Sequence, residues 1–133
     1  MKRYMLDTNA VSHLLKQHPV LAERIRHVPM ASLCISSVTA GELYYGMAKR
    51  PDATRLKRTV NELLKRMDVL PWQNSTAEIY GHLRAQTESL GKILGPLDML
   101  IAAHALESSA VLVSNDQAFR LVPGLVTEDW TAA

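Results

Sequence analysis

The chain has 133 residues, of which 47% are hydrophobic, so it can bury the core of one compact domain, which we expect to span residues 1–133. No apolar stretch approaches the roughly 18 residues of a transmembrane helix, and a single cysteine, Cys34, excludes a disulfide framework and a cysteine-based zinc site. The formal net charge of +2 identifies no polyanionic partner by itself. We therefore expect a reduced, cytoplasmic setting and no membrane association.

The positive charge is concentrated in one segment. Residues 49–66 carry seven Lys or Arg against two Asp or Glu, a local net charge of +5 in a chain whose remainder is slightly acidic. Two interpretations are open here: a solvated helix surface rich in Lys and Arg, or a local binding surface for phosphates.

Short apolar segments alternate along the chain with longer amphipathic ones. The first apolar segment ends at Asp7, where capping residues begin a helix. In chain order, the predicted strands are residues 4–6, 33–35, 69–71, 110–113 and 125–126, and the predicted helices are residues 10–15, 20–28, 37–50, 52–67, 75–90 and 96–105. This alternation predicts an α/β fold in which helices flank a central, mainly parallel β-sheet.

Four carboxylates lie where such a fold brings side chains together. Asp7 and Asp116 follow buried strands, Asp98 lies in the first turn of a helix, and Glu42 lies in a helix that follows another strand. Sites in parallel sheets form at the carboxyl ends of the strands, so we expect the four acids to converge there. Carboxylates that close together cannot all stay ionised without a cation. Oxygen ligands select Mg²⁺ or Mn²⁺ rather than zinc.

Each acid also has a purely structural interpretation. Asp7 and Asp116 are suitable helix N-caps, and the helix dipole favours Asp98 in a first turn. Glu42 is harder to explain in this way, because the neighbouring Gly41 lowers helix stability without a local gain. From the residues alone, a metal site and a set of helix caps remain alternatives.

Four motifs carry a family resemblance. They are MLDTN at residues 5–9, ISSVTAGEL at 35–43, GPLDMLIAAHA at 95–105 and LVSND at 112–116. In this order, and over nearly the whole chain, they resemble the signatures of PIN-domain proteins. In particular, they are similar to those of the VapC toxins of bacterial type II toxin–antitoxin modules.

The resemblance implies an endoribonuclease that uses Mg²⁺ or Mn²⁺ to hydrolyse structured RNA, commonly tRNA, at a single-stranded loop. Cleavage would inhibit translation and arrest growth. The residues that match the catalytic, metal-binding acids of the family are Asp7, Glu42, Asp98 and Asp116. The residues that match its supporting polar positions are Thr8, Asn9, Ser114 and Asn115.

Hydrolysis by water predicts a 3′-hydroxyl and a 5′-phosphate, whereas a 2′,3′-cyclic phosphate would indicate a metal-independent route. Glu42 would either bind the metal or deprotonate the attacking water. The last motif departs from the family pattern, because Ala118 stands where many members carry a further acid. We therefore expect one firmly held metal ion rather than two.

The resemblance also implies partners. VapC toxins commonly form homodimers and are neutralised by a VapB antitoxin, whose Arg or Lys competes with the metal for the carboxylates. The complex would bind operator DNA through the antitoxin. We expect the antitoxin groove to be lined by apolar residues of the helices after Asp7 and Ser37, including Leu14 and Tyr45.

The sequence disfavours two other functions. A DNA nuclease of the flap-endonuclease branch is disfavoured by the short chain without an arch-like insertion, and a degenerate PIN domain serving as a scaffold is disfavoured by the four intact acids. His104 lies in an apolar helical stripe, so we expect it to pack in the core or a dimer interface rather than catalyse. We expect Trp72 and Trp130 to be packing residues as well.

Overall fold

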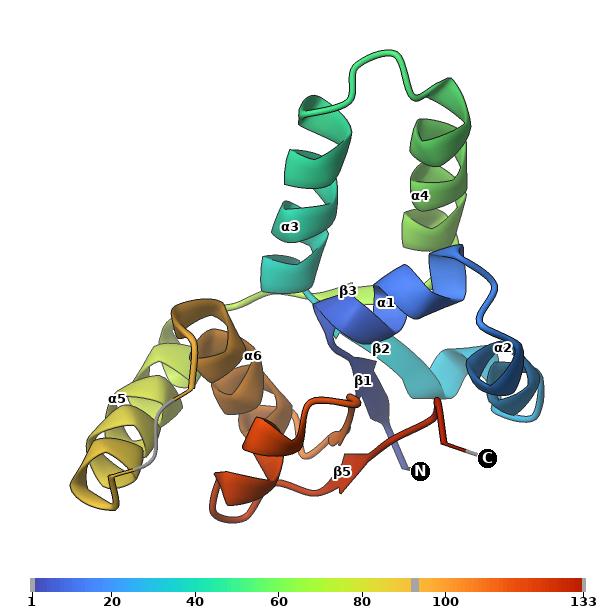
Figure 1. Ribbon diagram of the computed structural model, residues 1–133. Coiled ribbons are helices and arrows are strands. Elements are labelled where there is room, and N and C mark those ends of the chain that lie inside the picture. The colour runs from blue at the N-terminus through green and yellow to red at the C-terminus, as the bar shows by residue number, and fades with distance from the viewer. Residues whose placement is uncertain (1, 92–93, 133) are drawn as a thin grey trace.

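A computed structural model describes residues 2–91 and 94–132, which form a five-stranded parallel sheet flanked by helices (Figure 1). The strands are β1 (Tyr4–Leu6), β2 (Leu33–Ser36), β3 (Asp68–Leu70), β4 (Val111–Val113) and β5 (Thr127–Glu128). The helices are α1 (Thr8–Leu15), α2 (Pro19–Arg26), α3 (Ser37–Ala48), α4 (Thr54–Arg66), α5 (Asn74–Ser89) and α6 (Pro96–Glu107), with 3₁₀ turns η1 (Met30–Ser32) and η2 (Gln117–Leu121). The predicted α/β architecture is confirmed.

The strand order places β1 at the centre of the sheet. The order is β3-β2-β1-β4-β5, and every neighbouring pair is parallel. Tyr4 of β1 lies opposite Leu33 on one side and Val111 on the other. The chain thus builds outward from β1 to β3 and then returns to the opposite side of β1. This reversal makes the carboxyl ends of β1 and β4 the expected location of a ligand site.

Both faces of the sheet are covered by helices. Met5, Cys34 and Leu112 pack into a core with residues of α5 and α6, whereas Leu6 and Val113 pack into a second core with residues of α1 to α4. In Figure 1, α5 and α6 lie together on one side of the sheet, and α1 and α2 lie on the other. Burial on both faces explains why the strands are continuous apolar runs.

Polar residues at the strand ends begin the helices that follow. The side chain of Asp7 caps α1, that of Ser36 caps α3, and that of Asp116 caps η2. Pro96 occupies the first turn of α6, where its missing N–H leaves no hydrogen bond unmade. The same short segments that end the strands therefore fix the directions of the helices around the site.

Helices α3 and α4 form a hairpin that projects from the rest of the molecule (Figure 1). One side of α3 is buried through Thr39, Ala40, Leu43 and Met47, while α4 buries only Val60 among its residues. The loop that joins them lies at the tip of the hairpin. The basic segment identified in the sequence, residues 49–66, therefore occupies that tip and all of α4.

The last strand differs from its prediction. Residues 125–126 were favoured by hydrophobicity, but β5 comprises Thr127–Glu128. Gly124 has a φ of +80°, and the Leu125 N–H donates to the Val122 carbonyl at 3.3 Å, so the turn extends through residue 125. Pairing with β4 begins only where the Leu112 N–H reaches the Val126 carbonyl at 2.9 Å.

Other element ends lie within about two residues of their predicted positions, a normal uncertainty for helix and strand ends. Helix α5 begins at Asn74 because the Gln73 N–H donates to the Thr76 hydroxyl at 3.2 Å. Within residues 2–91 and 94–132, no helix is long and apolar enough to cross a membrane.

Candidate active site

Asp7 is fixed by the backbone at the end of β1. Its N–H donates to the Val113 carbonyl at 3.1 Å, which places it beside the end of β4. Its Oδ1 accepts the Ala10 N–H at 2.7 Å, and the residue is only 2% exposed. Asp7 is thus a helix cap and a buried carboxylate at the centre of the sheet, so its two interpretations from the sequence do not exclude each other.

Ser114 and Asp116 follow the neighbouring strand, β4. The Asp116 N–H donates to the Ser114 Oγ at 2.9 Å, and Asp116 Oδ1 accepts the Ala118 N–H at 2.9 Å. The Ser114 hydroxyl also bonds to the Asp7 side chain. One buried hydroxyl therefore contacts the Asp7 side chain and the Asp116 backbone.

Glu42 and Asp98 come from helices. The Thr8 hydroxyl donates to Glu42 Oε1 at 2.7 Å and lies 3.4 Å from the Thr39 hydroxyl. Asp98 lies in the first turn of α6, two residues after Pro96 at the start of the helix. Thr8 therefore holds one oxygen of Glu42 in place.

An open cavity brings these residues together. Its volume is about 280 Å³, and it is lined by Asp7, Thr8, Asn9, Glu42, Gly95, Pro96, Leu97 and Asp98. Asp116 and the exposed Asn115 line a smaller adjoining hollow with Ser114, Gln117, Arg120, Thr127 and Asp129. Three of the four predicted acids thus face one cavity, and the fourth lies beside it.

Electrostatic interactions connect all four acids. Burial raises the pKa of Asp7, and the charges of Asp98 and Asp116 add to this effect, whereas the Ser114 and Ala10 hydrogen bonds lower it. Burial also raises the pKa of Asp98, with further contributions from Asp116 and Glu42. A cation placed among these groups would relieve both effects, because it would favour their charged forms.

The donor set suits a hard divalent cation, since the polar groups around the cavity are carboxylates, a hydroxyl and an amide. As the side chains stand, no three His, Cys, Asp or Glu residues within 2–91 and 94–132 form a group that could hold a metal ion. The residues fit the ion by chemistry and charge, and their final geometry depends on it.

His104 is not part of this cavity. It is buried in α6, and its Nδ1 lies 2.7 Å from the Ser36 Oγ. Burial lowers its pKa. Trp130 is buried as well, and Trp72 donates its indole N–H to the Leu100 carbonyl at 3.1 Å. The prediction that these residues pack rather than catalyse agrees with their positions.

Two neighbouring residues were not singled out in the sequence. Thr39 is fully buried and lies close to the Thr8 hydroxyl, one helical turn before Glu42. Its i, i+3 spacing to Glu42 was the signal that could have revealed it. Arg120 lines the hollow of Asp116, and nothing in its sequence context distinguishes it from other surface arginines.

The chain matches the family model described as "PIN domain" over residues 4–125. It is also 36% identical over 131 residues to "Ribonuclease VapC2" of Haemophilus influenzae, covering 98% of this chain and 99% of that protein. The chain belongs to the VapC ribonucleases of the PIN-domain family. It is therefore a nuclease, and PIN-domain nucleases generally use divalent metal ions.

Other VapC relatives match as completely. The "tRNA(fMet)-specific endonuclease VapC" of Shigella flexneri is 35% identical over 132 residues, with 98% of this chain and 100% of that protein covered. The structure of DNA-bound VapBC from Salmonella typhimurium has a TM-score of 0.90 at 34% identity, with 98% and 99% of the chains covered. Rickettsia felis VapBC2, bound to a promoter DNA fragment, has a TM-score of 0.86 at 31% identity, with 96% and 98% covered. These matches confirm the predicted family and fold.

Proposed function

We propose that the chain is the toxin of a type II module and hydrolyses structured RNA, most simply a tRNA, at a single-stranded loop with Mg²⁺ or Mn²⁺. Cleavage inhibits translation and arrests growth. The observation that carries the proposal is the electrostatic coupling of Asp7, Glu42, Asp98 and Asp116 around one open cavity. The tRNA-specific name of the Shigella relative supports the substrate class.

In this proposal Asp7 and Asp98 bind the divalent ion, and Asp116 and Glu42 complete its surroundings. When bound, the ion lowers the pKa of the attacking water and offsets the charge of the scissile phosphate. The side chains of Thr8 and Asn9 are themselves polar groups in the cavity wall, and Ser114 keeps Asp7 in position.

Glu42 is the best placed proton acceptor. Its Oε1 is held by Thr8, and its other oxygen has no hydrogen-bond partner in the described part of the chain. Water attacks phosphorus and gives a proton to Glu42, the bond from phosphorus to the 3′ oxygen breaks, and the 3′ oxygen takes a proton from solvent water. The products are a 3′-hydroxyl and a 5′-phosphate.

The test is cleavage of unfractionated bacterial tRNA by the purified chain with Mg²⁺, with Mn²⁺ and with EDTA, followed by sequencing of the RNA ends. We expect cleavage only with metal, 5′-phosphate ends, and growth arrest on expression. Intact RNA in every condition would favour the scaffold, and cleavage of single-stranded DNA instead of RNA would favour the flap-endonuclease alternative.

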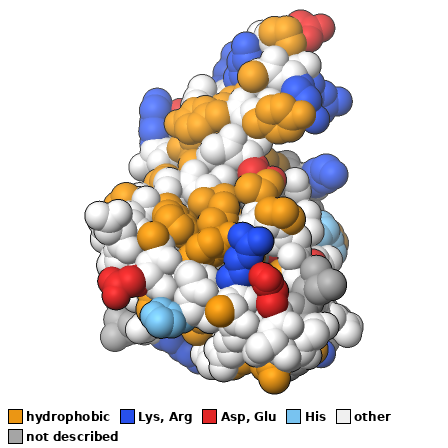
Figure 2. All heavy atoms as spheres, turned by 90° about the vertical axis from the view of Figure 1, so that its left-hand side faces the viewer, with side chains coloured by type: hydrophobic (Ala, Val, Ile, Leu, Met, Phe, Trp, Pro, Cys, Tyr) orange, Lys and Arg blue, Asp and Glu red, His pale blue; other side chains and the backbone are white. Residues whose placement is uncertain are grey.

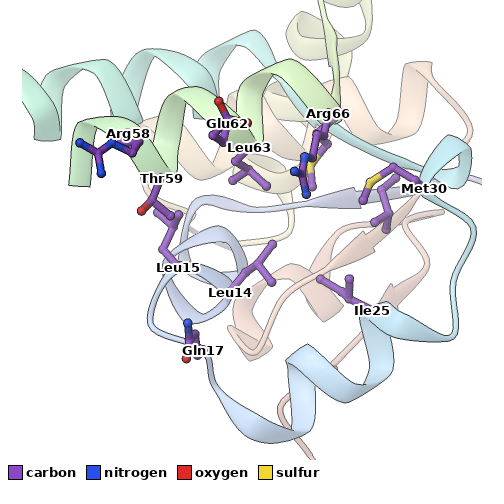
Figure 3. Close-up of a pocket in the computed structure, with 12 residues that line it drawn as sticks. Leu14, Leu15, Gln17, Ile25, Met30, Arg58, Thr59, Glu62, Leu63 and Arg66 are labelled. Atoms are coloured by element: carbon purple, nitrogen blue, oxygen red, sulfur yellow. The ribbon is translucent and has the colours of Figure 1, made fainter. Parts of the chain in front are cut away.

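We further propose that an antitoxin covers an apolar groove between α1, α2 and α4. Figure 3 shows Leu14, Leu15 and Ile25 pointing into this groove, whose volume is about 450 Å³. Helix α1 links it to the cavity, because Thr8 and Asn9 lie at one end of that helix and Leu14 and Leu15 at the other. Leu14 lines this groove and Tyr45 does not, so the proposed groove keeps the first of the two residues expected from the sequence and leaves the second outside.

The rim of the groove indicates the chemistry of the occupant. Arg58 and Arg66 of α4 lie at the rim with a single acid, Glu62. An amphipathic antitoxin helix with acidic flanks fits this rim, and the VapBC complexes among the similar structures support such a partner. An Arg or Lys of its extension would then reach the carboxylates and compete with the metal.

Leu14→Asp should weaken capture of a co-expressed antitoxin, because it places an unpaired charge in the groove. Leu90→Asp is the matched control, since Leu90 is exposed and lies at the end of α5. Equal antitoxin capture by both variants would contradict the groove. Two related proposals are tested with the same complexes. Light scattering tests whether the chain is a homodimer, and a mobility-shift assay tests whether the complex binds operator DNA.

A further inference from the structure

We propose that one face of α3, running from Glu42 through Tyr45 to Lys49, binds the single-stranded RNA that enters the cavity. Tyr45 stacks on a base, and Lys49 contacts a backbone phosphate. This inference rests on the proposed function and identifies the surface that holds its substrate. The face is called the α3 track below.

The three residues form one row along the helix. They lie at positions i, i+3 and i+7, and residues at these spacings share a helix face. Lys49 is the C-cap of α3, and its N–H still donates to the Tyr45 carbonyl at 3.1 Å. With a rise of about 1.5 Å per residue, Tyr45 and Lys49 lie about 4.5 and about 10.5 Å further along the axis than Glu42.

Glu42 sets the direction of this row relative to the chemistry. Its side chain lines the cavity and is held there by Thr8. The row therefore begins at the carboxylates and leads away from them along the projecting hairpin. A strand whose scissile phosphate lies in the cavity would place its next nucleotides over Tyr45 and Lys49.

Tyr45 and Lys49 have the chemistry of single-strand binding. Tyr45 is 64% exposed, which is unusual for a large aromatic side chain, and the Lys49 Nζ lies 4.7 Å from its ring centroid. This cation–π contact keeps the ring and the ammonium group next to each other. Aromatic rings that stack on bases beside cations that follow the backbone are the usual means of binding single strands.

The track is open and positively charged. A Cβ added at Gly46, one turn beyond Glu42, would meet no atom within 4 Å, so the protein leaves this part of the face uncovered. In the described part of the chain, neither Lys49 nor the adjacent Arg50 pairs with a carboxylate. Figure 2 shows Lys and Arg side chains beside hydrophobic ones on the projecting hairpin.

A protein partner would also cover an exposed tyrosine. Two observations favour RNA instead: the track is continuous with the carboxylate cavity, and its cations have no acidic partner. Tyr45 also lies outside the apolar groove assigned to the antitoxin. A polyanion that must reach the cavity fits these features better than an apolar surface does.

The experiment compares Tyr45→Ala and Tyr45→Phe with Tyr44→Ala, using Mg²⁺-dependent cleavage of unfractionated tRNA. Tyr44 is a matched control, because it is 56% exposed on the same helix but lies at i+2 from Glu42, away from the track. We expect Tyr45→Ala to lower kcat/KM by about 5- to 150-fold with kcat retained, as loss of one stacked base predicts. Tyr45→Phe and Tyr44→Ala should match the unsubstituted chain.

The charge is tested by Lys49→Ala against Lys65→Ala, since Lys65 is also exposed to solvent but pairs with Glu62 at 3.5 Å. Lys49→Ala should weaken tRNA binding and reduce the slope of log affinity against log salt by about 1. Lys65→Ala should leave the slope unchanged. Light scattering and antitoxin capture are measured on all variants.

The inference is overturned if Tyr45→Ala behaves like Tyr44→Ala, or if it lowers kcat and kcat/KM equally. A change in oligomeric state or antitoxin capture without a change in tRNA cleavage would also overturn it, and would assign Tyr45 to a protein interface. Absence of cleavage by the unsubstituted chain would instead contradict the proposed function itself, so the two failures are distinguishable.

Discussion

Asp7 and Glu42 line the same cavity but are held in different ways. Asp7 is nearly fully buried, and a backbone N–H and the Ser114 hydroxyl fix its side chain. Glu42 is half-buried and held by one side chain, Thr8. The strand-end acid is therefore positioned by the fold itself, whereas the helix acid keeps one oxygen without a hydrogen-bond partner in the described part of the chain. In the proposed mechanism this difference suits Asp7 to the role of a fixed metal ligand and Glu42 to that of a proton acceptor.

The largest effect is expected from Asp7→Asn. This change removes the charge but keeps an oxygen for the Ala10 N–H, so the helix cap survives. Cleavage of tRNA should fall by at least about 100-fold, because the proposed metal ion loses a charged ligand. Asp52→Asn, at the hairpin tip, is the control and should cleave normally. Activity of Asp7→Asn within tenfold of the unsubstituted chain would remove Asp7 from the site.

A smaller effect on cleavage is expected when Thr8, the residue that holds Glu42, is substituted. Thr8→Val preserves the shape of the side chain but removes the hydroxyl that bonds to Glu42 Oε1. Loss of such an outer contact typically lowers activity by about 10- to 100-fold. Thr8→Ser retains the hydroxyl and should retain most of the cleavage rate. If both variants were equally impaired, the hydrogen bond would not be the cause.

The sequence predicts some features of this fold better than others. The strand Tyr4–Leu6 was predicted to the residue, because the apolar run ends abruptly at an acid that begins a helix. Strand β5 was misplaced, because hydrophobicity marked Leu125 whereas the Gly124 turn decides where pairing begins. Local patterns therefore predicted elements well and turn geometry poorly.

The site shows the same limit. Its four acids were found by their position after strands and in first turns, which depends on local sequence. The link through Ser114 and the separate hollow of Asp116 depend on how β1 and β4 lie side by side, which no local pattern contains. For the same reason the sequence could not show that Leu14 lines the groove between α1, α2 and α4 while Tyr45 lies outside it.

The buried acids predict a moderate pH effect on stability. Burial raises the folded-state pKa of Asp7 and Asp98. Their contribution to metal-free stability is therefore fully present below the unfolded value of about 3.9 and is lost as pH rises through the raised values. Without metal, Asp7→Asn should therefore be more stable than the unsubstituted chain at neutral pH. This advantage should shrink as the pH falls, because Asp7 then becomes protonated.

Urea denaturation between pH 4 and 8 in EDTA measures this difference. Other carboxyls, such as Glu107, have lowered pKa values and act in the opposite direction, so the comparison of the two chains isolates Asp7. Adding Mg²⁺ should stabilise the unsubstituted chain and leave Asp7→Asn nearly unchanged, because a ligand that binds only the folded state raises its stability. A difference between the chains that does not vary with pH would show that Asp7 is not titrating.

The smallest effect is expected at the end of the last motif, where an acid can be added next to Asp116. The Ala118 N–H donates to Asp116 Oδ1 at 2.9 Å, but its side chain offers no ligand. Ala118→Asp should add a second, weaker metal-binding event in calorimetry, because a carboxylate then stands near Asp116. Cleavage at saturating Mg²⁺ should change little, since Asp7 and Asp98 still line the main cavity. Ala118→Asn controls for size. Two equal binding events in the unsubstituted chain would contradict this prediction. They would show that Asp116 and its neighbours hold a second ion without an acid at position 118.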